Sequence, residues 1–249
     1  LAEETTDSTE PSVAAFNGAT FHFAAGTYNF GETLDLKYNE VVTLELLGGY
    51  DANGNRNAEN NVTAFTGNNE HQIFNFASEM QCKFDGINFV NGYAEKGGAI
   101  VASLGSYSFT DCNFSENESV AGGGAILFSA GGSAIFENCE FNNNESTPLS
   151  PDLDGKAVGG TIYCNSNTTD LVLTFKGCVA SDNTAYRGGF ICSYGAKINI
   201  INSTLTGNES RRGGGVFYLS SAADLTVENC VFTENKALYG ATINADSQV

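Results

Sequence analysis

A short motif of two glycines followed by a mostly apolar pair recurs from residue 97 onward in this 249-residue chain. Its copies begin at Gly97, Gly123, Gly159, Gly188, Gly214 and, in degenerate form, Gly240. Counted at the second position of the motif, successive copies lie 26, 36, 29, 26 and 26 residues apart. A repeat at nearly constant period restricts the chain to folds in which one structural unit stacks on the next.

A second motif lies between these glycines and places cysteine, phenylalanine and asparagine in fixed order. Its clear copies are Cys112–Asn117, Cys139–Asn144 and Cys230–Asn235, with weaker copies at 178–183 and 203–208. Upstream of each copy, apolar residues alternate with other residues, which predicts a β-strand. The residue between strand and motif is of a type that tolerates positive φ, so we expect a corner there. These corner residues are Gly86, Asp111, Asn138, Gly177, Asn202 and Asn229.

The repeats predict an all-β fold, a single-stranded right-handed parallel β-helix (solenoid) of about eight coils with three short strands per coil. Equivalent residues of neighbouring coils then stack about 4.8 Å apart. We expect one internal column of Phe84, Phe109, Phe136 and Phe175, and another of Ile87 and four cysteines. A buried amide ladder is expected from Asn117, Asn144, Asn183, Asn208 and Asn235.

We expect one elongated β-helical domain over residues 12–249. Residues 12–80 fit irregular N-terminal coils, and residues 81–249 fit the regular repeats. An insertion near 147–158 accounts for the 36-residue interval, and a long loop on a regular scaffold is a common place for binding residues. Residues 1–11 hold four acidic residues and are expected to be disordered, or to form an acidic tether after a removed leader or lipid anchor.

Charge and cysteine content exclude several function classes. Lys and Arg number 11 against 29 Asp and Glu, which gives a net charge of −18. Such a chain repels phosphate backbones and anionic lipid, so we expect no nucleic-acid partner and no membrane insertion by this segment. The seven cysteines predict a buried reduced ladder, because stacked parallel positions suit disulfide geometry poorly.

The paired motifs resemble the repeats of polymorphic outer-membrane proteins, a family of bacterial adhesins and autotransporter passengers. The resemblance rests on Gly98–Ile100, Gly124–Ile126, Phe114–Asn117, Phe141–Asn144 and Phe232–Asn235, and it covers roughly residues 84–245. Earlier residues share only the general pattern of a pectin-lyase-like β-helix. The resemblance implies a secreted or outer-membrane, cell-surface location. The family's transporter barrel is not part of the sequence, so we expect a fragment or another export route.

The expected function is that of an adhesin or structural stalk, without catalysis. The alternative is a carbohydrate-active β-helix enzyme, either a polysaccharide lyase or a glycoside hydrolase, because this fold also hosts such enzymes. The sequence contains no Gly-His-Gly and no Arg-x-Lys element, and its two histidines, His22 and His71, fall on different predicted coils. These features favour a binding protein over an enzyme.

The candidate ligand-binding residues are Tyr186, Arg187, Arg212 and Tyr239, which lie just before Gly-Gly corners. An Arg and Tyr face can stack on or hydrogen-bond a sugar, so the expected partner is a host or community surface glycan or protein. Solvated side chains without a ligand are the alternative.

Calcium is the one cofactor considered, and no other is expected. Asp51, Asn53 and Asn55 place oxygen atoms at alternate positions, as an EF-hand loop does, and Asp152 and Asp154 form a second oxygen pair. The first loop lacks the glycine at its sixth position and has its glutamate at nine rather than twelve, so an Asn-rich turn is the alternative.

The last predicted strand ends near Ile243 without an amphipathic cap. An uncapped β-helix exposes a strand edge and a cross-section of its core. We therefore expect either further native sequence or end-to-end self-association.

Overall fold

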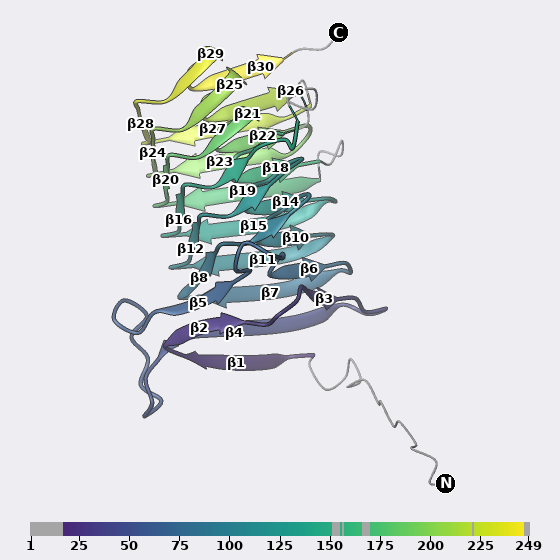
Figure 1. Cartoon of the computed structure of the whole chain (residues 1–249), viewed down its shortest axis with the longest axis vertical. Helices are drawn as coiled ribbons and strands as arrows, with labels where there is room; N and C mark the ends of the chain where they lie inside the picture. The colour runs from purple at the N-terminus through teal and green to yellow at the C-terminus, as the bar shows by residue number, and fades with distance from the viewer. Residues whose placement is uncertain (1–16, 151–154, 156, 166–169, 221, 247–249) are drawn as a thin grey trace.

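The computed structural model describes residues 17–150, 155, 157–165, 170–220 and 222–246. In this part the chain winds into a parallel β-helix whose coils stack along the longest axis of the molecule (Figure 1). These residues contain no helix that is long and apolar enough to cross a membrane. The acidic segment 1–11 lies outside the described residues.

Within the described residues, the first two of the four parallel sheets contain eight strands each. The first sheet contains β1 (Ala19–Ala24), β4 (Val42–Tyr50), β7 (Met80–Asp85), β11 (Gly105–Thr110), β15 (Gly132–Glu137), β19 (Leu171–Lys176), β23 (Lys197–Ile201) and β27 (Asp224–Glu228). The second contains β3 (Leu34–Leu36), β6 (Phe74–Phe76), β10 (Ile100–Ala102), β14 (Ile126–Phe128), β18 (Ile162–Cys164), β22 (Ile191–Ser193), β26 (Phe217–Ser220) and β30 (Ile243–Asp246).

The other two sheets contain the strands on either side of the Asn ladder. The third sheet contains β2 (Gly26–Asn29), β5 (Thr63–Thr66), β8 (Ile87–Val90), β12 (Asn113–Ser115), β16 (Glu140–Asn142), β20 (Val179–Ser181), β24 (Thr204–Thr206) and β28 (Val231–Thr233). The fourth contains β9 (Tyr93–Ala94), β13 (Glu118–Ser119), β17 (Glu145–Ser146), β21 (Thr184–Arg187), β25 (Glu209–Gly213) and β29 (Lys236–Tyr239).

The fourth sheet is a departure from the sequence prediction. Three sheets pass through eight coils as expected, but six coils carry an additional short strand. Several of these strands have only two residues, which is too short to display an alternating pattern. The second residue of each is Ala or Ser, because only a small side chain fits inside this corner of the coil. These residues are Ala94, Ser119, Ser146, Ala185, Ser210 and Ala237.

The predicted phenylalanine column is confirmed. Phe84, Phe109, Phe136 and Phe175 stack face to face, with ring centroids 5.0, 4.8 and 4.8 Å apart. All four are almost fully buried. A second stack, of Phe89, Phe114 and Phe141, meets the first edge-on, so the two columns fill the interior along the axis.

The predicted corners and amide ladder are also confirmed. All six corner residues have φ between 49° and 67°. Within the ladder, the Nδ2 of each asparagine before Asn235 donates to the Oδ1 of the next asparagine along the axis at 2.8–3.1 Å. Each Nδ2 also donates to a backbone carbonyl of the coil before it. The FxxN asparagines therefore hold neighbouring coils together and are not available to a ligand.

The cysteine column lies inside the coils as predicted. Cys112, Cys139 and Cys178 are buried in register with Ile87, whereas Cys230 in the last coil is only half-buried. All seven cysteines are free thiols in the structure. The contact with Cys112, together with burial, raises the pKa of the Cys139 thiol above its ordinary value, and the contact with Cys139, together with burial, does the same for Cys178. The buried cysteines of the ladder therefore pack as small apolar groups and are poor nucleophiles.

We expect maleimide to label native protein at Cys230 at least about tenfold faster than at any other cysteine, because thiolate and access are both needed for reaction. Quenched time points followed by peptide mass spectrometry measure the rates, and full labelling in denaturant is the reference. The variant Cys230→Ser should stay unlabelled over the same interval. Rapid native labelling of Cys139 or Cys178 would contradict the buried ladder.

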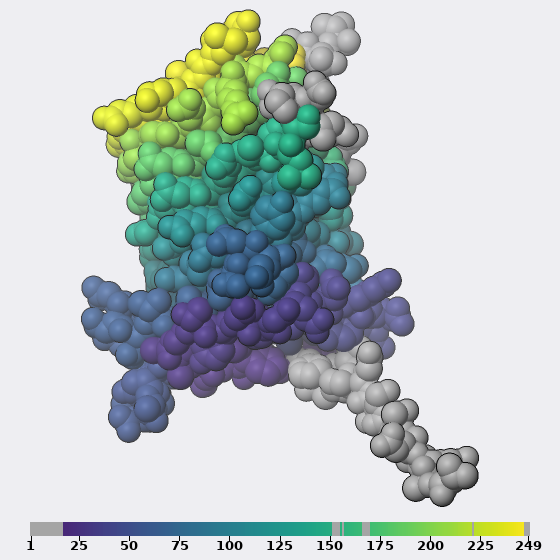
Figure 2. All heavy atoms as spheres, viewed as in Figure 1, coloured from purple at the N-terminus to yellow at the C-terminus, as the bar shows by residue number. Residues whose placement is uncertain are grey.

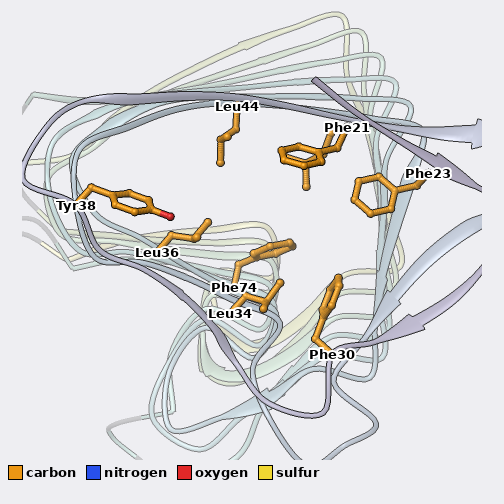
Figure 3. A pocket seen from close by; sticks show the side chains of 9 residues that line it. Phe21, Phe23, Phe30, Leu34, Leu36, Tyr38, Leu44 and Phe74 are labelled. Atoms are coloured by element: carbon orange, nitrogen blue, oxygen red, sulfur yellow. The ribbon is translucent and has the colours of Figure 1, made fainter. Parts of the chain in front are cut away.

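Both described ends of the coil stack expose core side chains. At the N-terminal end, an apolar cavity is lined by Phe21, Phe23, Phe30, Leu34, Leu36, Tyr38, Leu44, Leu46 and Phe74 (Figure 3). At the other end, Leu225 and Phe232 are half-buried and Ile243 is 44% exposed. The expected end-to-end association stays a prediction.

Candidate functional site

Three strands of the fourth sheet lead into the Gly-Gly corners of the last coils. They are β21, β25 and β29, which pair in parallel. Arg187 lies opposite Gly213, which in turn lies opposite Tyr239. The candidate ligand-binding residues therefore come from neighbouring coils. We call the surface formed by Tyr186, Arg187, Arg211, Arg212 and Tyr239 the Arg-Tyr corner.

A β-bulge in β25 shapes this corner. Ser210 and Gly213 both keep register with the strands on either side, and two residues, Arg211 and Arg212, lie between them. The neighbouring strands fill the same interval with one residue each, Tyr186 and Leu238. The extra residue makes β25 bend, and both arginines are exposed. Bulges of this kind commonly redirect side chains at functional sites.

The hydroxyl group of Ser210 closes the bulge from inside the coil. Its Oγ lies 2.9 Å from the carbonyl oxygen of Gly213 and 3.0 Å from that of Tyr186. The same oxygen accepts a hydrogen bond from the backbone N–H of Arg212 at 3.3 Å. Since Ser210 is buried, these contacts fix the backbone from which both arginines project.

Arg212 is held by a phenol. Its Nη1 donates a hydrogen bond to the hydroxyl oxygen of Tyr186 at 3.3 Å. This bond is the main reason why the pKa of Arg212 is raised above its ordinary value. Arg212 therefore keeps its positive charge at every physiological pH, with the rest of its guanidinium exposed.

Arg187 is packed more deeply. Its guanidinium lies 5.6 Å from the ring centre of Tyr186 and 5.1 Å from that of Tyr218, within the range of cation–π attraction. Its Nε is buried and has no hydrogen-bond partner among the described residues. Burial raises the pKa of Tyr218 to about 12, so this ring stays neutral beneath the cation.

Beneath Arg187 lies a second apolar cluster, on the outer face of the second sheet. It consists of Leu127, Val158, Tyr163, Cys192 and Tyr218. The main-chain segment at Ala157 and Val158, where the insertion ends, covers this face and extends the fourth sheet towards Tyr186 and Arg187. The sequence analysis did not predict this cluster, although the second residue of β10, β14, β18, β22 and β26 is apolar and could have indicated it.

The family model described as right-handed β-helix region matches residues 50–232. The chain belongs to the right-handed β-helix family. No curated protein and no solved structure matches the chain. Family membership establishes the fold and its handedness, while the ligand has to be argued from the residues of the site.

In this right-handed β-helix the Asp51 loop projects from the shaft between β4 and β5 (Figures 1 and 2). Asp51 Oδ1 accepts the backbone N–H groups of Asn53 and Asn55, each at 2.8 Å, and Oδ2 accepts from Asn55 Nδ2 at 3.1 Å. These bonds lower the pKa of Asp51. The carboxylate thus closes a turn, which favours the Asn-rich turn over the calcium site.

No group of three or more His, Cys, Asp or Glu with metal-binding geometry occurs in the part of the chain that the structure describes. Asp152 and Asp154 lie outside that part. Calcium binding therefore stays a prediction.

The β-helix keeps its histidines and its remaining arginine apart. His22 stacks on Tyr50 with ring centres 4.5 Å apart. His71 contacts the carbonyl oxygen of Gln72 and the Oδ1 of Asn29. Arg56 pairs with Asp85. Each group thus has a local partner on its own part of the shaft.

The four predicted ligand-binding residues are brought together but are not equivalent. Tyr186 and Arg187 are half-buried and support the corner, whereas Arg212 is exposed and Tyr239 is 57% exposed. The structure adds Arg211, on the other side of the bulge. The consecutive arginines were visible in the sequence, but the bulge that separates them from their neighbours was not.

Proposed function

We propose that this β-helix belongs to a secreted or cell-surface bacterial protein and acts as an adhesin, without catalysis. The observation that carries the proposal is the bulge in β25, which directs two arginines outward beside the exposed ring of Tyr239. Exposed Tyr and Arg side chains on a rigid scaffold are the residue types that contribute most to binding surfaces. The regular coils then serve as the stalk that carries them.

The protonation of the corner favours binding over catalysis. A general base works best when its pKa lies near the operating pH. The contact with Tyr186 raises the pKa of Arg212 above its ordinary value, away from that range. Arg212 is therefore suited to hold a partner by charge and hydrogen bonds. The alternative, a polysaccharide lyase or glycoside hydrolase, would have to use other residues.

The surface location rests on the resemblance of the GGA[ILV] and FxxN motifs to polymorphic outer-membrane protein repeats. The net charge of −18 is in keeping with a partner other than nucleic acid or anionic lipid. We propose that the partner is a surface glycan of a host or of a neighbouring cell. We also propose that this segment of the protein does not insert into the membrane.

Beads coated with the protein are expected to adhere to a subset of immobilised polysaccharides and mucin-type glycoproteins. The double variant Arg212→Gln/Tyr239→Ala should reduce retention at least about tenfold, because it removes both exposed contacts. Lys197→Gln is the matched control, since it removes one positive charge on another face of the shaft. Supernatants are assayed for newly formed reducing or unsaturated sugar ends.

Two results would contradict this function. Equal retention of wild-type protein and double variant would remove the Arg-Tyr corner as the binding surface. Release of sugar ends by wild-type protein and not by a heat-inactivated sample would support the enzyme instead.

A further inference from the structure

We propose that the Arg-Tyr corner recognises one acidic sugar, bearing a carboxylate or a sulfate, within an otherwise neutral glycan. This inference rests on the proposed function, in which the corner is the binding surface. It adds the chemical class of the ligand, because Arg187 and Arg212 both contact tyrosines, whose side chains leave the positive charge of the two guanidinium groups for an anionic ligand.

The first step of the inference concerns the positive charge of Arg187 and Arg212. Neither arginine takes part in the ion pairs of the described residues that join Arg56 to Asp85 and Lys176 to Glu137. Arg187 and Arg212 instead contact tyrosines, whose rings and hydroxyl groups carry no full negative charge. An anionic group on a ligand would neutralise this charge.

The second step is the geometry of the donors. Arg212 uses one Nη1 contact on Tyr186, which leaves other guanidinium N–H groups directed towards solvent. Arg187 is half-buried against Tyr186 and Tyr218 with its Nε enclosed, so it adds positive charge to the corner and not a donor that a ligand can reach. A guanidinium binds the two oxygens of a carboxylate or sulfate in a fork, so the corner suits a planar or tetrahedral oxyanion.

The third step is the apolar surface beside these donors. Tyr239 is 57% exposed, and Leu238, which lies opposite the bulge, is 69% exposed. An exposed aromatic ring next to hydrogen-bonding groups can cover the apolar face of a pyranose while its substituents reach the donors. This combination favours an acidic sugar over a free inorganic anion.

The fourth step limits the number of anionic groups. The whole chain carries −18, and a groove next to Arg211 is also lined by Glu145 and Glu209. At physiological salt, charges interact over about 8 Å. One anionic group at the corner is therefore attracted locally, whereas a dense polyanion would meet repulsion along the shaft. The corner thus selects an isolated acidic sugar.

The test is a glycan array on which every acidic glycan is printed beside its neutral parent, with sialyl, glucuronyl and sulfated forms of shared cores. Arrays also carry heparin and polygalacturonate as dense polyanions. Wild-type protein is compared with Arg212→Gln, Arg212→Lys and Lys197→Gln, each checked by circular dichroism for the native fold. Binding is repeated at increasing salt concentration.

We expect the acidic member of at least one pair to bind at least about tenfold more tightly than its neutral parent. Arg212→Gln should remove this preference, Arg212→Lys should restore part of it, and Lys197→Gln should leave it unchanged. The preference should weaken with salt. Whether sialyl and glucuronyl or sulfated forms carry it identifies carboxylate or sulfate as the anion.

Other outcomes separate this inference from the proposed function. Equal binding of acidic and neutral partners that still depends on Arg212 would overturn the acidic-sugar inference and leave the adhesin standing. Strongest binding to the dense polyanions would overturn the isolated-acid inference in the same way. Absence of binding to every glycan would overturn both, and a protein partner would then be the remaining ligand class for this surface.

Discussion

Asn183→Asp is expected to lower the free energy of unfolding by about 4 kcal/mol at neutral pH. Asn183 is fully buried, and its Nδ2 donates to Phe141 O at 2.9 Å and to Asn208 Oδ1 at 2.8 Å. The aspartate has nearly the same shape but no N–H, so three oxygens would face one another in the interior. Its own oxygen still accepts from Asn144, at 3.0 Å in the native chain.

The pH dependence of this variant has a definite sign. Burial beside two acceptor oxygens raises the folded-state pKa of the new carboxyl group above its unfolded value of about 3.9. The penalty is therefore smallest below the unfolded pKa, where the protonated group donates one bond, and it grows as pH rises through the folded pKa. Denaturant unfolding followed by circular dichroism at several pH values measures it.

Asn199→Asp is the matched control. Asn199 lies on the outer face of the first sheet and makes one long contact, 3.4 Å from its Nδ2 to Thr174 Oγ1. The same change of charge and shape there should alter stability by no more than about 0.5 kcal/mol. Equal losses in the two variants would mean that net charge, and not the amide ladder, causes the effect.

The fold was largely predictable because every coil of the β-helix is stabilised by the same kinds of contact at the same motif positions. Phe109 and Phe136 occupy equivalent motif positions, so the repeat period alone predicts that they stack on each other. The six corner residues were predictable for a different reason, since only a few residue types tolerate positive φ. Family membership and sheet order bear out these expectations.

The site was less predictable because it depends on departures from the repeat. The bulge at Arg211 and Arg212 adds a residue within a strand, and the Gly-Gly period does not record where that residue lies. The position of Val158 depends on how the insertion returns to the sheet. The oxygen-bearing residues of the Asp51 loop are spaced as in a calcium-binding loop. In the structure, however, backbone N–H groups of the same loop donate hydrogen bonds to the Asp51 carboxylate.

Gly160→Ala is expected to cost about 3 kcal/mol or more, or to prevent folding, because there is no space for a methyl group. An added Cβ would meet the carbonyl oxygen of Gly189 at 2.1 Å and that of Thr184 at 2.6 Å. Both atoms belong to the backbone of the next coil, which cannot move without breaking the sheet hydrogen bonds on either side. The second glycine of the motif is thus required for close approach between coils.

Gly54→Ala is the control that separates the lack of space for a methyl group from the effect of backbone conformation. Gly54 has φ of +82° and nothing within 4 Å of an added Cβ. An alanine there should lower the free energy of unfolding by about 1 kcal/mol, because only its positive φ is unfavourable. Thermal and urea unfolding of both variants should give a loss at Gly160 at least about twice that at Gly54. If the two losses were equal, the glycines of the repeat would serve the turn and not the spacing. The repeat would then tolerate alanine wherever φ is negative.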